Sequence, residues 1–146
     1  MKTRPNTIAL IATARNLANA YLQGRLEKAG LAGLAPTHGS IIDALMKQGD
    51  LPMRSLAERI RRDKSTVTAL VKKLERLGYV RRRTAETDSR LVMIGLTRKG
   101  KALEETFNDI SAGMFTVALD DVSDAEVRRL EATLTKIIAN FTNGGH

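Results

Sequence analysis

The 146-residue sequence has no cysteine, no tryptophan and only two histidines. Without cysteine the chain can form no disulfide scaffold, thiolate metal site, cysteine nucleophile or thiol redox switch. With only His38 and His146 available, a histidine-rich zinc site is also disfavoured. Stability must therefore come from an ordinary hydrophobic core, for which this length suffices in one domain, here residues 1–146.

Long hydrophobic runs are absent too. A basic start, Met1 to Arg4, precedes the apolar stretch from Ile8 to Ala14, which is far shorter than the ~20 residues that span a bilayer. It is also at the lower limit for a signal-peptide core, and the apolar positions continue at helical spacing through Leu17 and Tyr21. This pattern predicts an amphipathic helix in a cytoplasmic protein without a membrane partner.

Catalytic motifs are missing as well. There is no nucleophile elbow, no plausible inward pair of carboxylates and no phosphate-cradling glycine loop, and His38 has no evident catalytic partner. We therefore expect no enzyme and no cofactor.

Charge is abundant and unevenly distributed. The net charge is +8, yet residues 54–101 hold 15 basic and 5 acidic side chains, while the rest holds 9 basic and 11 acidic ones. A basic block in a near-neutral chain is typical of a surface that contacts phosphates. The alternative is a solvated face that is basic for solubility.

Periodicity and capping residues predict a mainly α chain with one β-hairpin. A first helix begins at Asn6 or Thr7 and ends near Lys28, and a second begins at Pro36 and stops at Gly49-Asp50. A short third helix opens with the capping box Ser55 to Glu58, and Asp63 caps a fourth over residues 65–77. Strands over 79–83 and 91–96 follow, then one helix from Thr97 past Val117, one opened by Ser123 to Glu126, and a loose tail over 143–146.

The helix over 65–77 has two distinct faces. Val67, Leu70, Val71, Leu74 and Leu77 form an apolar stripe, and Ser65, Ala69, Lys72 and Arg76 lie opposite. A short helix, a tight turn and such a helix form a helix-turn-helix, whose second helix fits a DNA major groove. Ser65 and Thr68 could then contact base edges and Ala69 a thymine methyl group, with Lys72 and Arg76 on phosphates.

The hairpin offers a second contact. Arg90 at its base could enter a neighbouring minor groove, where narrow A·T-rich segments concentrate negative potential. Of Arg81, Arg82 and Arg83, at most two should meet phosphate, and the alternative is a solvated strand edge that resists aggregation.

Ordered motifs now resemble one family. They are Leu56-Ala-Glu-Arg-Ile60, the run from Asp63 to Val80, Asp88-Ser-Arg90 and Leu96-Thr-Arg-Lys-Gly100, and they look like the MarR (multiple antibiotic resistance regulator) family. The resemblance implies a winged-helix homodimer joined by its terminal helices, which binds palindromic operators, usually as a repressor, and releases DNA on binding a small aromatic or anionic effector. It also implies a DNA-binding lobe over 31–100 and dimerisation helices over 5–30 and 101–142.

The candidate sites follow from both lines of reasoning. The expected DNA contacts are Lys64, Ser65, Thr66, Thr68, Ala69, Lys72, Arg76, Arg82 and Arg90, with Asp88 orienting Arg90. His38 is a candidate effector contact, with an exposed position or the dimer interface as alternatives. Two features depart from the family pattern. The family often has Leu-Thr-Pro where this chain has Leu34-Ala35-Pro36, so a capping hydroxyl is missing. Gly39, within the same expected helix, costs ~1 kcal/mol relative to alanine.

Two alternatives remain open. The apolar stripes of the terminal helices could be intramolecular core rather than a dimer interface. The basic surface could also serve a non-specific architectural or RNA-binding protein. RNA-binding modules, however, usually stack bases on exposed aromatic side chains, and aromatic residues of any kind make up only 3% of this chain.

Overall fold

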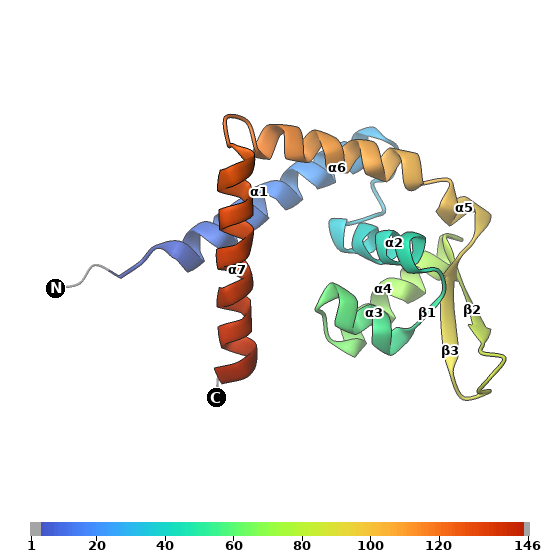
Figure 1. The fold of residues 1–146 in the computed structure, drawn as a ribbon. Coiled ribbons are helices and arrows are strands. Elements are labelled where there is room, and N and C mark those ends of the chain that lie inside the picture. The colour runs from blue at the N-terminus through green and yellow to red at the C-terminus, as the bar shows by residue number, and fades with distance from the viewer. Residues whose placement is uncertain (1–3, 145–146) are drawn as a thin grey trace. The chain divides into compact units, whose positions relative to one another are not determined.

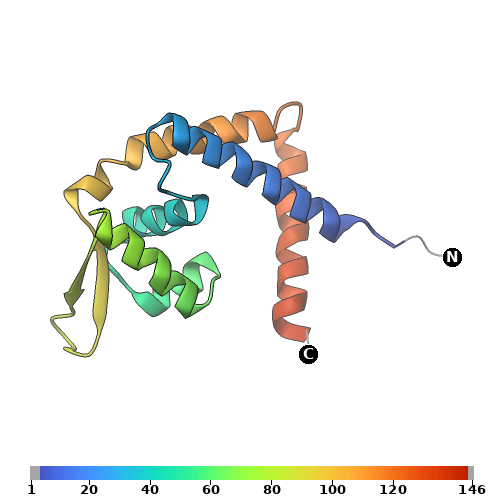
Figure 2. The same cartoon turned by 180° about the vertical axis from the view of Figure 1, so that it is seen from behind.

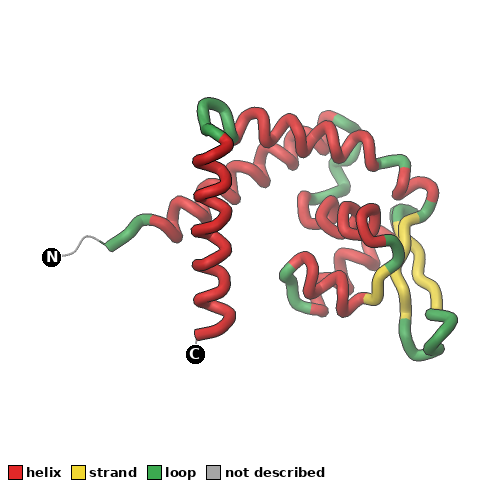
Figure 3. Tube along the Cα trace, viewed as in Figure 1, coloured by secondary structure: helices red, strands yellow, loops and turns green. Residues whose placement is uncertain are grey.

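The computed structural model describes residues 4–144, so predictions for Met1–Thr3 and for Gly145–His146 lie outside the described residues. The elements are α1 (Thr7–Lys28), α2 (Pro36–Gln48), β1 (Leu51–Pro52), α3 (Met53–Ile60), α4 (Lys64–Arg76), β2 (Val80–Thr84), β3 (Val92–Leu96), α5 (Arg98–Lys101), α6 (Glu104–Ala118) and α7 (Asp124–Gly144) (Figure 1). The predicted mainly α fold with a small antiparallel sheet is confirmed (Figure 3). The chain divides into two compact units after Met114.

The core of the first unit lies where α2, α3 and α4 pack against the sheet (Figures 1 and 2). Its largest fully buried side chains are Leu34, Ile41, Ile42, Leu56, Val67, Val71, Leu74 and Ile94. Burying each such side chain stabilises the fold by about 1.5–3 kcal/mol. Because α4 contributes three of them, its orientation is set by the core and its opposite face is left to solvent.

The sheet has the order β1-β3-β2, with antiparallel pairing throughout. Strands β2 and β3 lie within one residue of their predicted bounds, and Arg81 pairs with Gly95 between them. The third strand, β1, was not predicted, because two residues are too few to show an alternating pattern. It pairs Leu51 with Ile94 and so joins the helix-turn-helix to the hairpin.

Three predicted helix starts are confirmed by their capping bonds. The Asp63 carboxylate accepts the Thr66 N–H at 3.4 Å, Thr97 Oγ1 accepts the Gly100 N–H at 3.1 Å, and Ser123 and Glu126 exchange bonds of 3.2 and 2.9 Å. The hydrogen bonds from Ser123 lower the pKa of Glu126, and those from Ser65 and Thr66 lower the pKa of Asp63.

Three other expectations were wrong. Helix α3 begins at Met53 with Pro52 as its N-cap, so the predicted cap Ser55 lies inside the helix. The helix begins there because the pairing of β1 with β3 ends at Pro52, after which the chain can turn. The helix predicted from Thr97 is interrupted between α5 and α6. There the Leu103 N–H donates to the Gly100 carbonyl oxygen at 3.2 Å, three residues back, which is the tighter spacing of a 3₁₀ turn. Helix α7 continues to Gly144, through part of the predicted tail, because one glycine disfavours a helix without ending it.

The terminal helices carry little of the core. Leu26 is the only buried residue of α1, and α7 has none. Large apolar side chains therefore remain exposed on the surface of each unit: Ile8, Leu10 and Leu17 on α1, and Phe115, Val117, Leu130, Ile138 and Phe141 in the second unit. Within residues 4–144, none of the helices combines the length and apolar character that a membrane span requires.

Candidate nucleic-acid interface

The outward face of α4 carries the side chains predicted to meet DNA. Ser65, Ala69, Lys72 and Arg76 are exposed, while Val67, Val71 and Leu74 on the opposite side are buried. Lys64 and Thr66 are exposed as well, and Thr68 is half-buried. The helical period thus separates a packed stripe from a face of small, hydroxyl and cationic groups, as predicted from the sequence.

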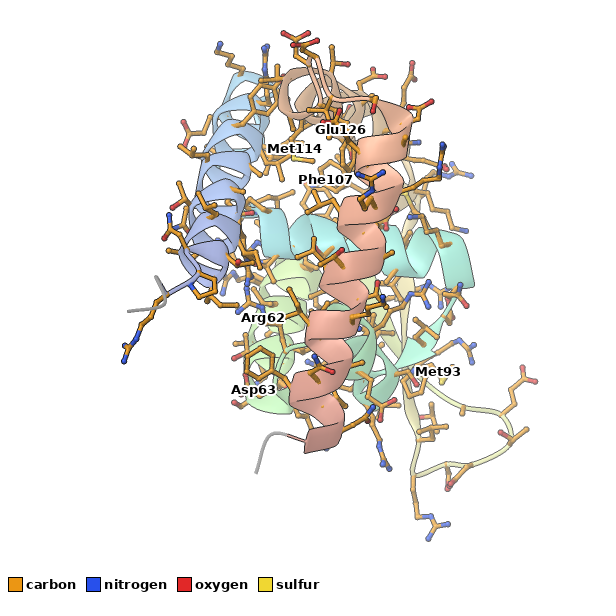
Figure 4. All side chains as sticks on the ribbon, turned by 60° about the vertical axis from the view of Figure 1, so that its left-hand side comes forward. Arg62, Asp63, Met93, Phe107, Met114 and Glu126 are labelled. Atoms are coloured by element: carbon orange, nitrogen blue, oxygen red, sulfur yellow. The ribbon has the colours of Figure 1, made fainter. Side chains whose placement is uncertain are left out.

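The first turn of α4 is ordered by its own carboxylate. The Ser65 hydroxyl donates to Asp63, and the Thr68 hydroxyl donates to the Lys64 carbonyl at 2.8 Å. Both hydroxyl protons are therefore engaged, and their oxygens keep lone pairs that can accept hydrogen bonds from base edges. Asp63 lies beside Arg62 in the turn that precedes the helix (Figure 4).

The cations of this face differ in whether a carboxylate neutralises them. Within the described residues, no carboxylate lies within 4.0 Å of Lys64, Lys72 or Arg76. Arg82 instead pairs with Glu75 of α4 at 3.2 Å. The three unpaired cations thus lie on the outward face of α4, where they can meet a polyanion.

The hairpin between β2 and β3 presents Arg90. Its Nε donates to Asp88 Oδ1 at 3.2 Å, and its backbone N–H donates to the same oxygen at 3.0 Å. The Arg90 side chain is nevertheless 90% exposed. Asp88 therefore holds the arginine by one edge and leaves the rest of its guanidinium to solvent.

His38 is buried, not exposed. Its Nδ1 accepts the Ala35 N–H at 2.8 Å, and its Nε2 has no hydrogen-bond partner among the described residues. Burial, followed by the positive charge of Lys73, lowers the pKa of His38. The neutral imidazole thus accepts the backbone N–H of the N-cap residue Ala35, which is a different donor from the N–H that a hydroxyl at position 35 would accept.

A cavity of about 310 Å³ lies in the first unit between α1, α2 and α6. Apolar side chains and several polar ones line it: Leu22, Leu26, Pro36, Gly39, Ser40, Asp43, Lys47, Phe107, Asn108, Ile110 and Ser111. His38 is not among them, and its effector role stays a prediction. A Cβ on Gly39, which lines the cavity, would meet nothing within 4 Å, so no close packing contact requires a glycine at this position.

The sequence did not predict the cavity or the two carboxylates that pair with arginines of the hairpin. Asp50 accepts a hydrogen bond from Arg83, which is 33 residues away, and Glu75 forms an ion pair with Arg82. No local pattern could have shown these contacts, because they join segments that only the tertiary fold brings together.

The comparisons with known proteins match this geometry. A family model described as MarR family matches residues 32–91, which contain the helix-turn-helix, β2 and the loop that leads to β3. The HTH-type transcriptional regulator SarZ of Staphylococcus haemolyticus is 34% identical over 107 residues, which are 73% of this chain and 71% of that protein. SarZ of Staphylococcus epidermidis is 37% identical over 83 residues, 57% of this chain, and the match spans only 56% of that relative's length.

Two solved structures show the same fold. The Staphylococcus aureus MepR–DNA complex has a TM-score of 0.83 at 24% identity, covering 94% of this chain and 99% of that one. Bordetella bronchiseptica BpsR, whose DNA binding is regulated by 6-hydroxynicotinic acid, has a TM-score of 0.79 at 20% identity, covering 88% and 90%. At these identities the likeness concerns the fold alone.

Proposed function

Because the chain belongs to the MarR family, we propose that it is a homodimeric, sequence-specific DNA-binding transcriptional repressor that a small molecule releases from a palindromic operator. The single observation that carries this proposal is the outward face of α4. It combines exposed hydroxyl and methyl groups with Lys64, Lys72 and Arg76, which no carboxylate neutralises in the described chain. Such a face suits a major groove, where side chains read base edges and cations meet phosphates.

Each side chain then has a role. Ser65, Thr66, Thr68 and Ala69 contact base edges, and the three cations contact phosphates along the groove walls. Arg90, held by Asp88, enters the adjacent minor groove. Arg82, which the sequence placed among the DNA contacts, must first exchange its pairing with Glu75 for a phosphate.

Exposed apolar faces support the homodimer. Along α7, Leu130, Ile138 and Phe141 are 54%, 43% and 69% exposed, and an isolated helix with such a stripe is marginal in water. A second copy of the chain, pairing through the terminal helices, would cover it. Two recognition helices would then address half-sites ~34–36 Å apart, about one turn of B-form DNA.

The cavity supports effector control. Its volume of about 310 Å³ is at the lower end of the ~300–1,000 Å³ usual for small-molecule sites. Phe107 and Ile110 offer apolar contacts, and the Asp43–Lys47 pair at 3.0 Å offers charge. BpsR, which shares the fold, is regulated by an aromatic acid. A small aromatic or anionic compound is therefore the proposed effector class.

The DNA-binding proposal is tested by selecting duplexes from a random library and measuring the dissociation constant of the selected sequence against a scrambled one. We expect a palindromic selection bound at least ~10³-fold more tightly than the scrambled duplex. A ratio near one would favour the non-specific architectural protein.

The dimer is tested by analytical ultracentrifugation of Leu130→Glu beside Ala132→Glu. Both substitutions add one carboxylate to α7, but residue 132 lies about 200° from residue 130 around the helix, away from the apolar stripe. Leu130→Glu should dissociate the dimer and Ala132→Glu should not. A monomeric wild-type protein would contradict the proposal.

Effector control is tested by a thermal-shift screen of aromatic acids, followed by operator binding in the presence of each stabilising compound. A coupling of ~1–3 kcal/mol would weaken operator binding about 5- to 150-fold. If no compound changes the operator affinity of a protein that binds DNA soundly, the effector part of the proposal fails.

A further inference from the structure

Asp50 lies on the solvent face of the sheet, across from the arginines of β2. Because Leu51 pairs with Ile94 and Arg81 with Gly95, residues 50, 95 and 81 stand opposite one another across the three strands. Asp50 Oδ2 accepts the Arg83 Nε–H at 2.7 Å and lies 4.0 Å from the nearer Arg81 nitrogen. One carboxylate thus serves two guanidinium groups.

Gly95 makes this arrangement possible. A Cβ on residue 95 would overlap the Asp50 carboxylate, whose side chain is only 24% exposed. The absence of a side chain in the central strand lets the carboxylate cross above it and reach the arginines. This contact is built into the sheet and differs from a pairing of two freely moving surface side chains.

The third arginine of β2 is also paired. Side chains alternate along a strand, so Arg82 points to the other face, where it meets Glu75. Every arginine of β2 therefore has a carboxylate partner, in contrast to the unpaired Lys64, Lys72 and Arg76 of α4.

We propose that Asp50 is a positioning residue that holds Arg81 and Arg83 away from DNA phosphates and so limits the sequence-independent affinity of the protein. This inference rests on the proposed DNA-binding function. Phosphates must compete with this carboxylate for Arg81 and Arg83, whose side chains are 51% and 41% exposed, against 90% for Arg90. Sequence-independent affinity depends almost wholly on pairing of cations with phosphates. With Arg81 and Arg83 paired to Asp50, Arg90 is the hairpin arginine that can most readily contact DNA.

The test measures binding to a fluorescent duplex of arbitrary sequence, about 30 base pairs or three helical turns long, over a range of KCl concentrations. Asp50→Asn keeps the shape of the side chain and removes its charge. We expect about 2- to 30-fold tighter binding at low salt, as two exposed ion pairs form with phosphate. The salt slope should steepen by up to about two units, since each added contact contributes about 0.9.

Two matched variants separate positioning from overall charge. Asp109→Asn removes one exposed carboxylate from α6 and should leave the slope unchanged. Replacing Arg81 and Arg83 with glutamine should change the slope little in the wild-type background and should cancel the gain in the Asp50→Asn background.

The outcomes are distinct. If the wild-type protein ignores the duplex at low ionic strength, the proposed function fails and this inference with it. If the wild-type protein binds but Asp50→Asn binds equally or more weakly, or if Asp109→Asn steepens the slope as much, the inference alone is overturned. A purely structural role for Asp50 predicts weaker binding with a shallower slope, opposite in sign.

Discussion

Replacing Gly100 with alanine should change the stability of the protein through two opposing effects, a gain in helix propensity and a steric clash. Alanine favours a helix over glycine by about 1 kcal/mol in a helix interior, and by less in a four-residue helix such as α5. A Cβ at residue 100, however, would overlap the Tyr79 carbonyl oxygen and lie 3.0 Å from the Leu96 side chain. That carbonyl is fixed, because it accepts the Thr97 N–H at 3.0 Å.

The steric effect should win. Overfilling a packed site usually costs about 1–3 kcal/mol, and the upper part of that range applies because the obstructing atom belongs to hydrogen-bonded backbone. After subtracting the helix preference, we expect Gly100→Ala to lower the free energy of unfolding by about 2 kcal/mol. For a chain of this size that corresponds to a Tm lower by about 4–8 °C.

Gly39→Ala is the matched control. This glycine also lies in a helix, but an added Cβ would meet nothing within 4 Å. The same substitution should therefore stabilise the protein by up to about 1 kcal/mol and raise the Tm by about 2–4 °C.

Thermal and urea denaturation of the three proteins at equal protein concentration measures the difference, since the proposed dimerisation would make the Tm depend on concentration. Opposite shifts for the two variants are the expected result. If Gly100→Ala melts at or above the wild-type temperature, the close approach of Gly100 to the Tyr79 carbonyl is not as described, and the reasoning is refuted.

Three further predictions concern the interface and His38. Lys72→Ala should weaken binding to all duplexes alike and make the salt slope shallower by about one unit in a KCl titration, and an unchanged slope would remove Lys72 from the phosphate contacts. Arg90→Ala should weaken operator binding most for operators with A·T-rich flanks, as comparison of A·T- and G·C-flanked duplexes would show, and equal losses would exclude the minor-groove role. Because burial and Lys73 lower the pKa of His38 below 6.5, the unfolded chain binds the proton first as the pH falls. The stabilisation from the neutral imidazole is therefore present above pH 6.5 and is lost as the pH falls below that value. Urea denaturation at about pH 7.5 and 5.5 should show that the wild-type protein loses stability at the lower pH. The loss should be smaller in His38→Gln than in the wild-type protein.

Local chemistry made most helix boundaries and the faces of α4 predictable from the sequence. A capping side chain satisfies N–H groups two or three residues away, so Asp63, Thr97 and Ser123 could be identified without any knowledge of distant segments. The alternation of apolar and polar residues at a period of 3.6 also depends on neighbours along the chain alone, and this is why the exposed face with Lys72 and Arg76 was assigned correctly.

Distant contacts decided the rest. Strand β1 exists because β3 is there to pair with it, and this pairing places the start of α3 at Met53 instead of after Ser55. The tertiary fold likewise buried His38, opened a cavity lined in part by Gly39 and brought Asp50 to Arg83 across 33 residues. The sequence by itself therefore determined which residues of α4 face outward, because that property is local. Only the tertiary structure decided which of their charges remain free, because pairing depends on segments that are far apart in the chain.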